Sequence, residues 1–263
     1  EISTLFPTED LIKLGNCSAT AFYHEQGEYD QERNVMMVDL SRKIIIFLDQ
    51  PGNSLLTRLR ALLSHDEKEI QAKITDKNQK GGNRTKTVII RGFPVVIFCT
   101  AGLMLDEQEA TRFLLLSPEI SQEKIQEAIQ EKIKKEANTG GYRMGLEKNP
   151  QRMLLQRRIL AIKEQHISEI RIENPEFIEE KFYTKVKVFK PRHSRDIARI
   201  ISLTKVFALL NLWYRDRIEG DPVANTADIE EAFVLWEQIS ESQELNLPPY
   251  IYNLYHDVLL RAY

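Results

Sequence analysis

Asp49 is the first residue whose type and position suggest catalytic chemistry, because it ends the apolar run Ile44–Leu48. In a nucleotide hydrolase, an acidic residue at the end of a buried strand holds Mg²⁺, usually through its waters. Gln50 follows, and its amide can orient a water molecule but cannot accept its proton. The alternative is structural: an Asp before Pro51-Gly52 can simply close a turn.

Thr100 and Arg112 could complete such a site. Thr100 ends the apolar stretch VVIFCT, where its hydroxyl could reach a γ-phosphate or the attacking water. Arg112, in EATRFLLL, could stabilise the charge on a transferred phosphoryl group. An arginine supplied by a neighbouring subunit is worth about 10³ to 10⁵ in rate. Thr100 alone is a weak signal, and the alternative for Arg112 is a solvent-facing arginine at a strand start.

A basic segment around Gly81-Gly82 is a candidate DNA contact. Two β-rich arms flank the glycines, so the segment predicts a hairpin, and its cations are Lys77, Lys80, Arg84 and Lys86. Each phosphate that such cations neutralise contributes a slope of about −0.9 in log K against log[salt] on duplex DNA and about −0.7 on single strands. The alternative is a solvated loop whose charges protect a sheet edge from aggregation.

The elements that must position these residues alternate between strands and helices, which predicts an α/β layer structure. Residues 44–48 indicate a central parallel strand buried on both faces, and the leucines of 54–63 predict an amphipathic helix. Residues 94–99 indicate another apolar strand. At the N-terminal side, residues 4–15 suggest a connection and a short helix. Residues 18–25 and 34–40 suggest two extended runs, in a hairpin or a small insertion.

Beyond Pro118 the pattern predicts helices and no further strand of the buried type. Helical periodicity covers residues 121–137, 152–166, 194–214, 228–240 and 249–262. Aromatic residues in the last three segments, such as Trp213, Tyr214 and Trp236, are expected to form the core of a helical domain. Cys17 and Cys99 are expected to be buried small side chains, because neither a disulfide framework nor a zinc-binding pattern is present.

Composition excludes several classes of protein. The 263 residues are 42% hydrophobic and 29% charged with a net charge of −3, as expected for a globular chain that is not a polycation. No window approaches the roughly 18 to 20 apolar residues of a membrane span, and the first residues lack the features of a signal peptide. We therefore expect an intracellular protein without a membrane partner.

Three motifs in this order resemble the AAA+ ATPases of the minichromosome maintenance and plasmid or viral replicative helicase kind. Ile44–Gln50 resembles the Walker B strand, Pro94–Thr100 the sensor-1 strand, and Thr111–Phe113 the arginine-finger motif. Further along, PRHSRDIARIISLTKVFALL is similar to the lid helix that carries the sensor-2 arginine, and VANTADIEEAFVLWE to the closing lid helix. The sensor-2 arginine maps to Arg192, with Arg195 or Arg199 as alternatives.

The resemblance implies an ATP- and Mg²⁺-dependent helicase or translocase in DNA replication. It would act on single-stranded or forked DNA as a ring, with six subunits the expected number. The implied domains are an α/β core over 1–120, a helical connection over 121–188 and a helical lid over 189–263. A cytoplasmic, nucleoid-associated protein of archaeal or mobile-element origin would fit.

Two departures from the family pattern leave an alternative open. Gln50 stands where the family has glutamate, so hydrolysis would be slow, another carboxylate would serve, or the residue is an engineered replacement. The sequence also contains no G-x-x-x-x-G-K-[ST] loop, so we expect the phosphate-binding loop to precede residue 1 and this chain alone to be inactive. The alternative is a non-catalytic DNA-binding or assembly module with a degenerate AAA+ fold.

Overall fold

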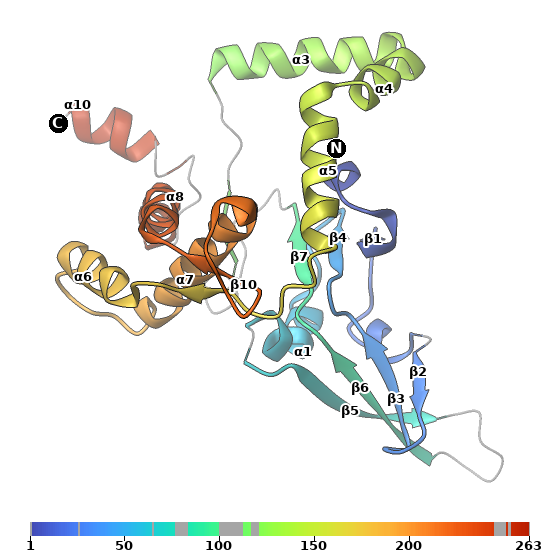
Figure 1. Cartoon of the computed structure of the whole chain (residues 1–263). Coiled ribbons are helices and arrows are strands. Elements are labelled where there is room, and N and C mark those ends of the chain that lie inside the picture. Colours follow the sequence, from blue (N-terminus) through green and yellow to red (C-terminus); the bar gives the residue numbers. More distant parts are fainter. Residues whose placement is uncertain are drawn as a thin grey trace. The chain divides into compact units, whose positions relative to one another are not determined.

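The structure is a computed structural model that describes residues 2–25, 27–64, 66–76, 84–99, 113–116, 121–244, 251 and 254–262 (Figure 1). The side chains of residues 76, 84, 241–244, 257 and 261 lie outside this description. The chain divides into two compact units, Glu1–Arg112 and Phe113–Tyr263. We describe each unit by itself.

A three-stranded parallel sheet forms the centre of the first unit. Its order is β1-β4-β7, with β1 at Leu11–Leu14, β4 at Ile44–Phe47 and β7 at Val95–Phe98. The prediction of a central parallel strand at 44–48 is thus confirmed, and so is the α/β class. Burial alternates along β4, with Ile45 and Phe47 buried, so the expectation of burial on both faces is wrong.

Residues 11–14 correct a second expectation, because they form strand β1 instead of a helix. Ile12 and Leu14 pack against the hydrophobic core, and the backbone pairs in register with β4 from Leu11 opposite Ile44 to Leu14 opposite Phe47. This pairing satisfies the backbone polar groups of a segment that is too short to make a stable helix of its own.

A second sheet, of order β2-β3-β6-β5, contains the predicted basic hairpin. Its strands are β2 (Glu28–Asp30), β3 (Val35–Asp39), β6 (Arg84–Arg91) and β5 (Glu69–Asp76). The two hairpin arms pair antiparallel from Glu69 opposite Arg91 to Asp76 opposite Arg84, which confirms the predicted arms. The tip, residues 77–83, lies outside the described residues.

The predicted hairpin at residues 18–40 has a different first arm. Residues 18–25 are not extended, because Ala21–Tyr23 form a 3-10 turn that buries Phe22 and Tyr23. Strand β2, within the polar stretch, pairs with β3 instead. The Asp30 carboxylate accepts hydrogen bonds from the backbone N–H groups of Glu32 and Arg33, and these two bonds close the reversal.

The two sheets are joined by a pair of short corners. Strand β3 continues through residues 40–43 into β4, and β6 continues through residues 92–94 into β7. The parallel pair β3–β6 of one sheet thus leads into the parallel pair β4–β7 of the other. Across the corner, the Leu40 N–H donates to the Arg91 carbonyl at 2.8 Å and the Val95 N–H to the Lys43 carbonyl at 2.9 Å. Gly92 has a φ of +101°, which only glycine adopts at little cost.

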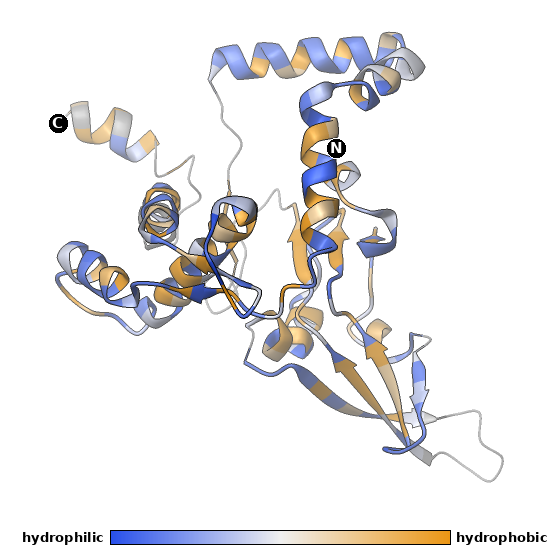
Figure 2. Ribbon diagram, viewed as in Figure 1, coloured by the Kyte–Doolittle hydropathy of each residue, from blue (hydrophilic) through white to orange (hydrophobic). Residues whose placement is uncertain are grey.

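Helix α1, Asn53–Leu63, confirms the predicted amphipathic helix and covers the core of the first unit. Its inward residues Leu55, Leu56, Leu59 and Leu62 are almost fully buried. Figure 2 shows both hydrophobic and hydrophilic colours along this helix. Leu55, Leu59 and Leu62 join a core that includes Ile45 and Ile90. The helix follows β4 directly and therefore fixes where the segment with Asp49 leaves the sheet.

The second unit is mainly helical, as predicted. Its longer helices are α3 (Gln122–Ala137), α4 (Thr139–Glu147), α5 (Pro150–Lys163), α6 (Pro175–Lys185), α7 (His193–Leu210) and α8 (Thr226–Glu244). A π-helical turn at Tyr255–Leu259 and a short α10 at Leu260–Ala262 follow. Helices α6, α7 and α8 enclose a core that includes Phe182, Ile200 and Phe233.

A small sheet in this unit contradicts the expectation of no further buried strand. Its order is β8-β10-β9, with β8 at Arg171–Ile172, β10 at Asp221–Ala224 and β9 at Arg217–Ile218. Glu219 and Gly220 both have positive φ angles and make a two-residue reversal between β9 and β10. Val223 and Ala224 of β10 are buried.

Two expectations about side chains also change. Trp236 is buried as expected, but Trp213 and Tyr214 are exposed, so the aromatic core is smaller than predicted. Cys17 is half-buried and Cys99 is exposed, so the expected burial of Cys99 is wrong. None of the helices in the described ranges combines the length and apolar composition that crossing a bilayer requires.

Candidate functional site

Asp49 lies just beyond the carboxyl end of the central strand of the parallel sheet. Strand β4 ends at Phe47, and the Leu48 N–H still donates to the Leu14 carbonyl of β1 at 2.9 Å. The next two residues leave the sheet, with Asp49 exposed and Gln50 half-buried, before helix α1 begins. Ligands of open parallel sheets bind outside this edge. The Asp49 carboxylate is thus at the edge where it could bind the Mg²⁺ ion of a nucleotide.

The neighbouring strand β7 ends at the same edge. It pairs with β4 in parallel register, Phe98 opposite Phe47, and the exposed Cys99 follows it. Thr100 and Arg112 lie outside the described residues. The arrangement therefore brings together the ends of the two strands that were predicted to carry Asp49 and Thr100.

This edge could bind a magnesium ion only if a bound nucleotide and water supplied the other ligands. In the described part of the chain, no group of three or more His, Cys, Asp or Glu residues could hold a metal ion. Mg²⁺ in nucleotide sites needs only one or two carboxylates, because phosphates and waters supply the remaining ligands. The single Asp49 carboxylate fits that mode of binding and does not fit a metal cage made of protein alone.

A buried ion cluster at the start of α7 contains two of the three candidate sensor-2 arginines. Asp196 is 3% exposed. Its carboxylate accepts from Nε of Arg192 at 3.3 Å and from Nη1 of Arg199 at 3.2 Å. Arg199 also donates from Nη2 to the carbonyl of Phe113 at 3.0 Å. Burial of this guanidinium lowers the pKa of Arg199, although Asp196 opposes the shift.

The third candidate, Arg195, is exposed on the same first turn of α7. The adjacent His193 is buried, and its Nδ1 accepts the N–H of Lys190 at 3.0 Å. Its ring also packs edge-on against Phe182. His193 therefore has a structural role at the start of α7. Arg195 is the exposed one among the three candidate arginines.

The basic hairpin presents its cations unequally. Lys86 on β6 lies opposite Ile74 and is half-buried, so its aliphatic stem covers the apolar strand. Lys73 on β5 is exposed and was not singled out from the sequence. Lys77 and Lys80 lie outside the described residues, and so does the side chain of Arg84, whose backbone ends the ladder.

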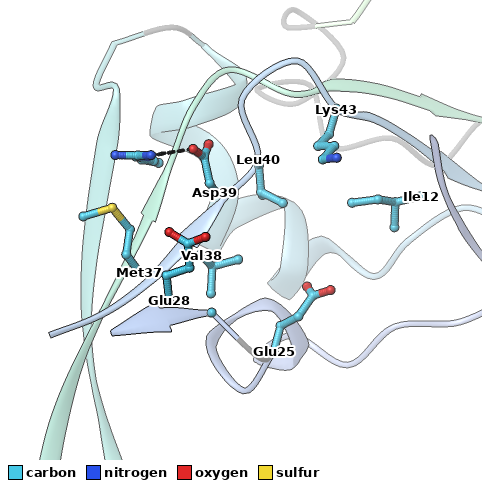
Figure 3. Close-up of a pocket in the computed structure, with 10 residues that line it drawn as sticks. Ile12, Glu25, Glu28, Met37, Val38, Asp39, Leu40 and Lys43 are labelled. Atoms are coloured by element: carbon cyan, nitrogen blue, oxygen red, sulfur yellow. Dashed lines mark hydrogen bonds and ion pairs between the residues drawn. The ribbon is translucent and has the colours of Figure 1, made fainter. Parts of the chain in front are cut away.

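A cavity of about 550 Å³ lies elsewhere in the first unit (Figure 3). Its lining includes Ile12 and Lys43, at the amino-terminal side of β1 and β4, and does not include Asp49 or Gln50. Its charged groups are already paired in part: Arg91 Nη2 lies 2.7 Å from the Asp39 carboxylate, and Lys43 Nζ donates to the Glu9 carbonyl. The cavity is therefore at the opposite edge from the predicted nucleotide site.

The pairing with Arg91 alters the acid behaviour of Asp39. Desolvation acts to raise the pKa of Asp39, but hydrogen bonds from Arg91 and Ser41 outweigh it and lower the pKa. Both side chains are more than one-third exposed, so water screens the pair. The Asp39–Arg91 ion pair therefore has a structural role at the corner between the two sheets.

No protein-family model and no curated protein sequence matches this chain. The assignment of residues to roles therefore depends on the residues and the geometry. Sequence reasoning missed Asp196, although the spacing of Arg192, Asp196 and Arg199 places all three on one helix face. It also missed Asp228, 1% exposed, which Arg215 contacts with Nε at 2.6 Å and Nη2 at 2.7 Å.

Proposed function

We propose that this chain is the larger part of the ATPase motor of a ring-forming AAA+ DNA helicase or translocase, similar to minichromosome maintenance proteins and plasmid or viral replicative helicases. The main support is the position of Asp49, which follows the central strand of the order β1-β4-β7 at the carboxyl edge. The basic hairpin lies between that strand and β7 in sequence, as such a motor requires.

In this proposal each site residue has one task. Asp49 holds the Mg²⁺ of bound ATP, and Gln50 orients the attacking water without taking its proton. Thr100 contacts the γ-phosphate, and Arg112 reaches the nucleotide of the next subunit in the ring, which we expect to have six members. No phosphate-binding loop of the G-x-x-x-x-G-K-[ST] type occurs among these 263 residues.

Arg195 is the better candidate for the sensor-2 arginine. Arg192 and Arg199 both bond the buried Asp196, and moving either to a phosphate would leave that carboxylate with one cation fewer. Arg195 lies on the same turn and is exposed. We therefore assign lid closure to Arg195 rather than to Arg192.

The alternative function is a non-catalytic DNA-binding or assembly module. The Asp49-Gln50 pair and the lack of a Gly-Lys-Ser/Thr loop favour it. ATP turnover by the intact protein with any loop-bearing upstream segment separates the two. Asp49→Asn should lower turnover by about 10²-fold or more, and Gln50→Glu should raise it by restoring a base. An intact protein that neither binds nor hydrolyses ATP would refute the proposed motor and favour the non-catalytic module.

The DNA role has a separate test in the salt dependence of binding. Replacing Lys77, Lys80 and Arg84 by Ala should reduce the slope of log K against log[salt] by about 2 on single strands, or about 0.7 for each cation. A matched triple Ala variant at Lys124, Lys132 and Lys135 of α3 removes the same charge and should leave the slope unchanged. Equal slopes for both triple variants would remove the hairpin from the DNA-binding site.

A further inference from the structure

The segment that joins helices α6 and α7 concentrates positive charge. Residues 181–195 contain six Lys and Arg residues and no Asp or Glu, although the whole chain has a net charge of −3. The cations are Lys181, Lys185, Lys187, Lys190, Arg192 and Arg195. Two of them have buried or nearby counter-ions in the second unit, since Lys185 pairs with Glu237 and Arg192 with Asp196. Lys187 and Lys190, between the two helices, are exposed.

Two aromatic rings are exposed on the same segment. Tyr183 is 55% exposed and Phe189 is 61% exposed, and their ring centroids lie 5.3 Å apart with the ring planes at 73°. Single exposed apolar side chains are common on protein surfaces, but these two rings contact each other, and the neighbouring Val188 is 73% exposed. The charge of Glu179 and its hydrogen bond with the Tyr183 hydroxyl raise the pKa of Tyr183, so this ring stays neutral. We call Tyr183, Lys187, Val188, Phe189 and Lys190 the α6–α7 patch.

Contacts on both sides hold the α6–α7 patch in place. Just after α6, the Val186 N–H donates to the Phe182 carbonyl at 2.9 Å, and the Val186 side chain packs against the core of the second unit. On the other side, the Lys190 N–H donates to Nδ1 of the buried His193 at 3.0 Å. Only residues 187–189 lie between these two anchors. The patch therefore has little conformational freedom to lose when a ligand binds.

We propose that the α6–α7 patch binds single-stranded nucleic acid, with unpaired bases stacking on Tyr183 and Phe189 and phosphates bound near Lys187 and Lys190. Single strands have both features that the patch complements, because their bases are free to stack and their phosphates are charged. A polyanion without bases would need only the lysines. A protein partner is disfavoured because Lys is depleted from protein–protein interfaces. This binding needs neither ATP hydrolysis nor the basic hairpin of the first unit.

The role of the rings is tested by the affinity of the full chain for labelled oligothymidylate and oligouridylate of about 15 nucleotides, measured by fluorescence anisotropy. All proteins in the test also carry Lys77→Ala, Lys80→Ala and Arg84→Ala, so that the hairpin does not contribute. Phe189→Leu keeps an apolar side chain but loses the ring, and it should raise Kd by about 5- to 150-fold. Tyr214→Leu removes another aromatic side chain of the same unit, 79% exposed, and should leave Kd unchanged.

The role of the lysines is tested by the salt dependence of the same binding. Lys187→Gln combined with Lys190→Gln should reduce the slope of log K against log[salt] by about 1.4, or about 0.7 for each cation. Lys132→Gln combined with Lys135→Gln removes the same charge from two exposed positions of α3 and should leave the slope unchanged. On a duplex of the same length, Phe189→Leu should have no effect, because paired bases cannot stack on the ring.

A loss of affinity for either single strand in Phe189→Leu, with none in Tyr214→Leu, supports the proposal, and the strand that loses more identifies the preferred sugar. An unchanged Kd in Phe189→Leu overturns it, even if the lysine variant weakens binding, because the patch would then bind any polyanion. An equal loss on duplex, or no binding by the chain with an intact patch, also overturns it. If urea denaturation shows that Phe189→Leu does not fold, Tyr183→Leu takes its place.

Discussion

Replacing Gly92 by alanine should destabilise the corner that joins the two sheets. Gly92 has a φ of +101°, and an added Cβ would lie 2.6 Å from Cα of Ser41 and closer still to its backbone nitrogen. Two other glycines serve as controls. Gly220 has a similar φ of +93° but open space around it, and Gly145 lies in α4 with open space and an ordinary helical position.

The three substitutions separate the sources of the cost. Gly220→Ala should cost only the backbone strain, about 1–3 kcal/mol. Gly92→Ala adds a collision with backbone atoms, so the corner must shift, which weakens the bonds from Leu40 to Arg91 and from Val95 to Lys43. Each such bond contributes about 0.5–1.5 kcal/mol, which makes the total about 2–6 kcal/mol. Gly145→Ala should stabilise its helix by about 0.5–1 kcal/mol.

Hydrogen exchange is the appropriate assay, because two units need not unfold as one. In Gly92→Ala, the amides of Leu40 and Val95 should exchange faster by about 1.5 to 4 orders of magnitude, at about 1.4 kcal/mol for each factor of ten, while those of α7 keep their protection. In urea denaturation, the free energy of unfolding should fall most in Gly92→Ala, less in Gly220→Ala, and rise in Gly145→Ala. A Gly92→Ala protein that loses no more stability than Gly220→Ala would refute the steric part of this reasoning.

Three further predictions concern other charged and reactive groups. Asp228→Asn should cost about 3–5 kcal/mol in urea denaturation because it leaves Arg215, whose side chain is 12% exposed, without its counter-ion, and a cost below 1 kcal/mol would contradict this. The lowered pKa of Asp39 means that its contribution to stability is present above its ordinary value of about 3.9 and disappears as pH falls through the lowered pKa. Asp39→Asn should therefore reduce the loss of stability of the first unit below pH ~4, and an unchanged acid profile would exclude the role. Cys99, which is exposed, should react with a thiol reagent before Cys17, because burial raises the pKa of the Cys17 thiol. Mass spectrometry of partly labelled protein would detect the opposite order.

The sequence predicted those elements whose pattern is long and whose partners are close. Strand β4 is marked by consecutive apolar residues, helix α1 by leucines at helical spacing, and the β5–β6 hairpin by two β-rich arms around glycines. Local pattern failed for β1 and β10. Each has only four residues, and each pairs in parallel with a segment distant in the sequence, although β10 also pairs with the adjacent β9.

The candidate site divides in the same way. Asp49 could be placed from the sequence because the end of an apolar strand is a local feature. The role of Asp196 could not, because its importance comes from burial and from two arginines that could equally have faced solvent. The link from Arg199 to Phe113 spans 86 residues and ends on a backbone carbonyl, which carries no sequence signal. Contacts of this kind become visible only in the folded chain.

In the proposed motor, the corner at Gly92 gives a mechanical reason for a DNA-binding hairpin to precede the strand that leads to Thr100. Strand β6 is an arm of the hairpin, and it becomes β7 after only three residues. Four contacts hold the corner in place. They are the Asp39–Arg91 ion pair and the backbone hydrogen bonds that the N–H groups of Leu40, Gly92 and Val95 donate to the carbonyls of Arg91, Lys68 and Lys43.

A displacement of β6 along its axis must therefore move β7, because a pinned corner cannot absorb it. In the proposed motor, β7 leads to Thr100 beside the strand end that carries Asp49, so a force on DNA at the hairpin would reach the nucleotide without a separate relay. The same argument requires that a weakened corner lowers the stimulation of ATP turnover by DNA more than it lowers turnover without DNA, since the contacts between nucleotide and protein are untouched.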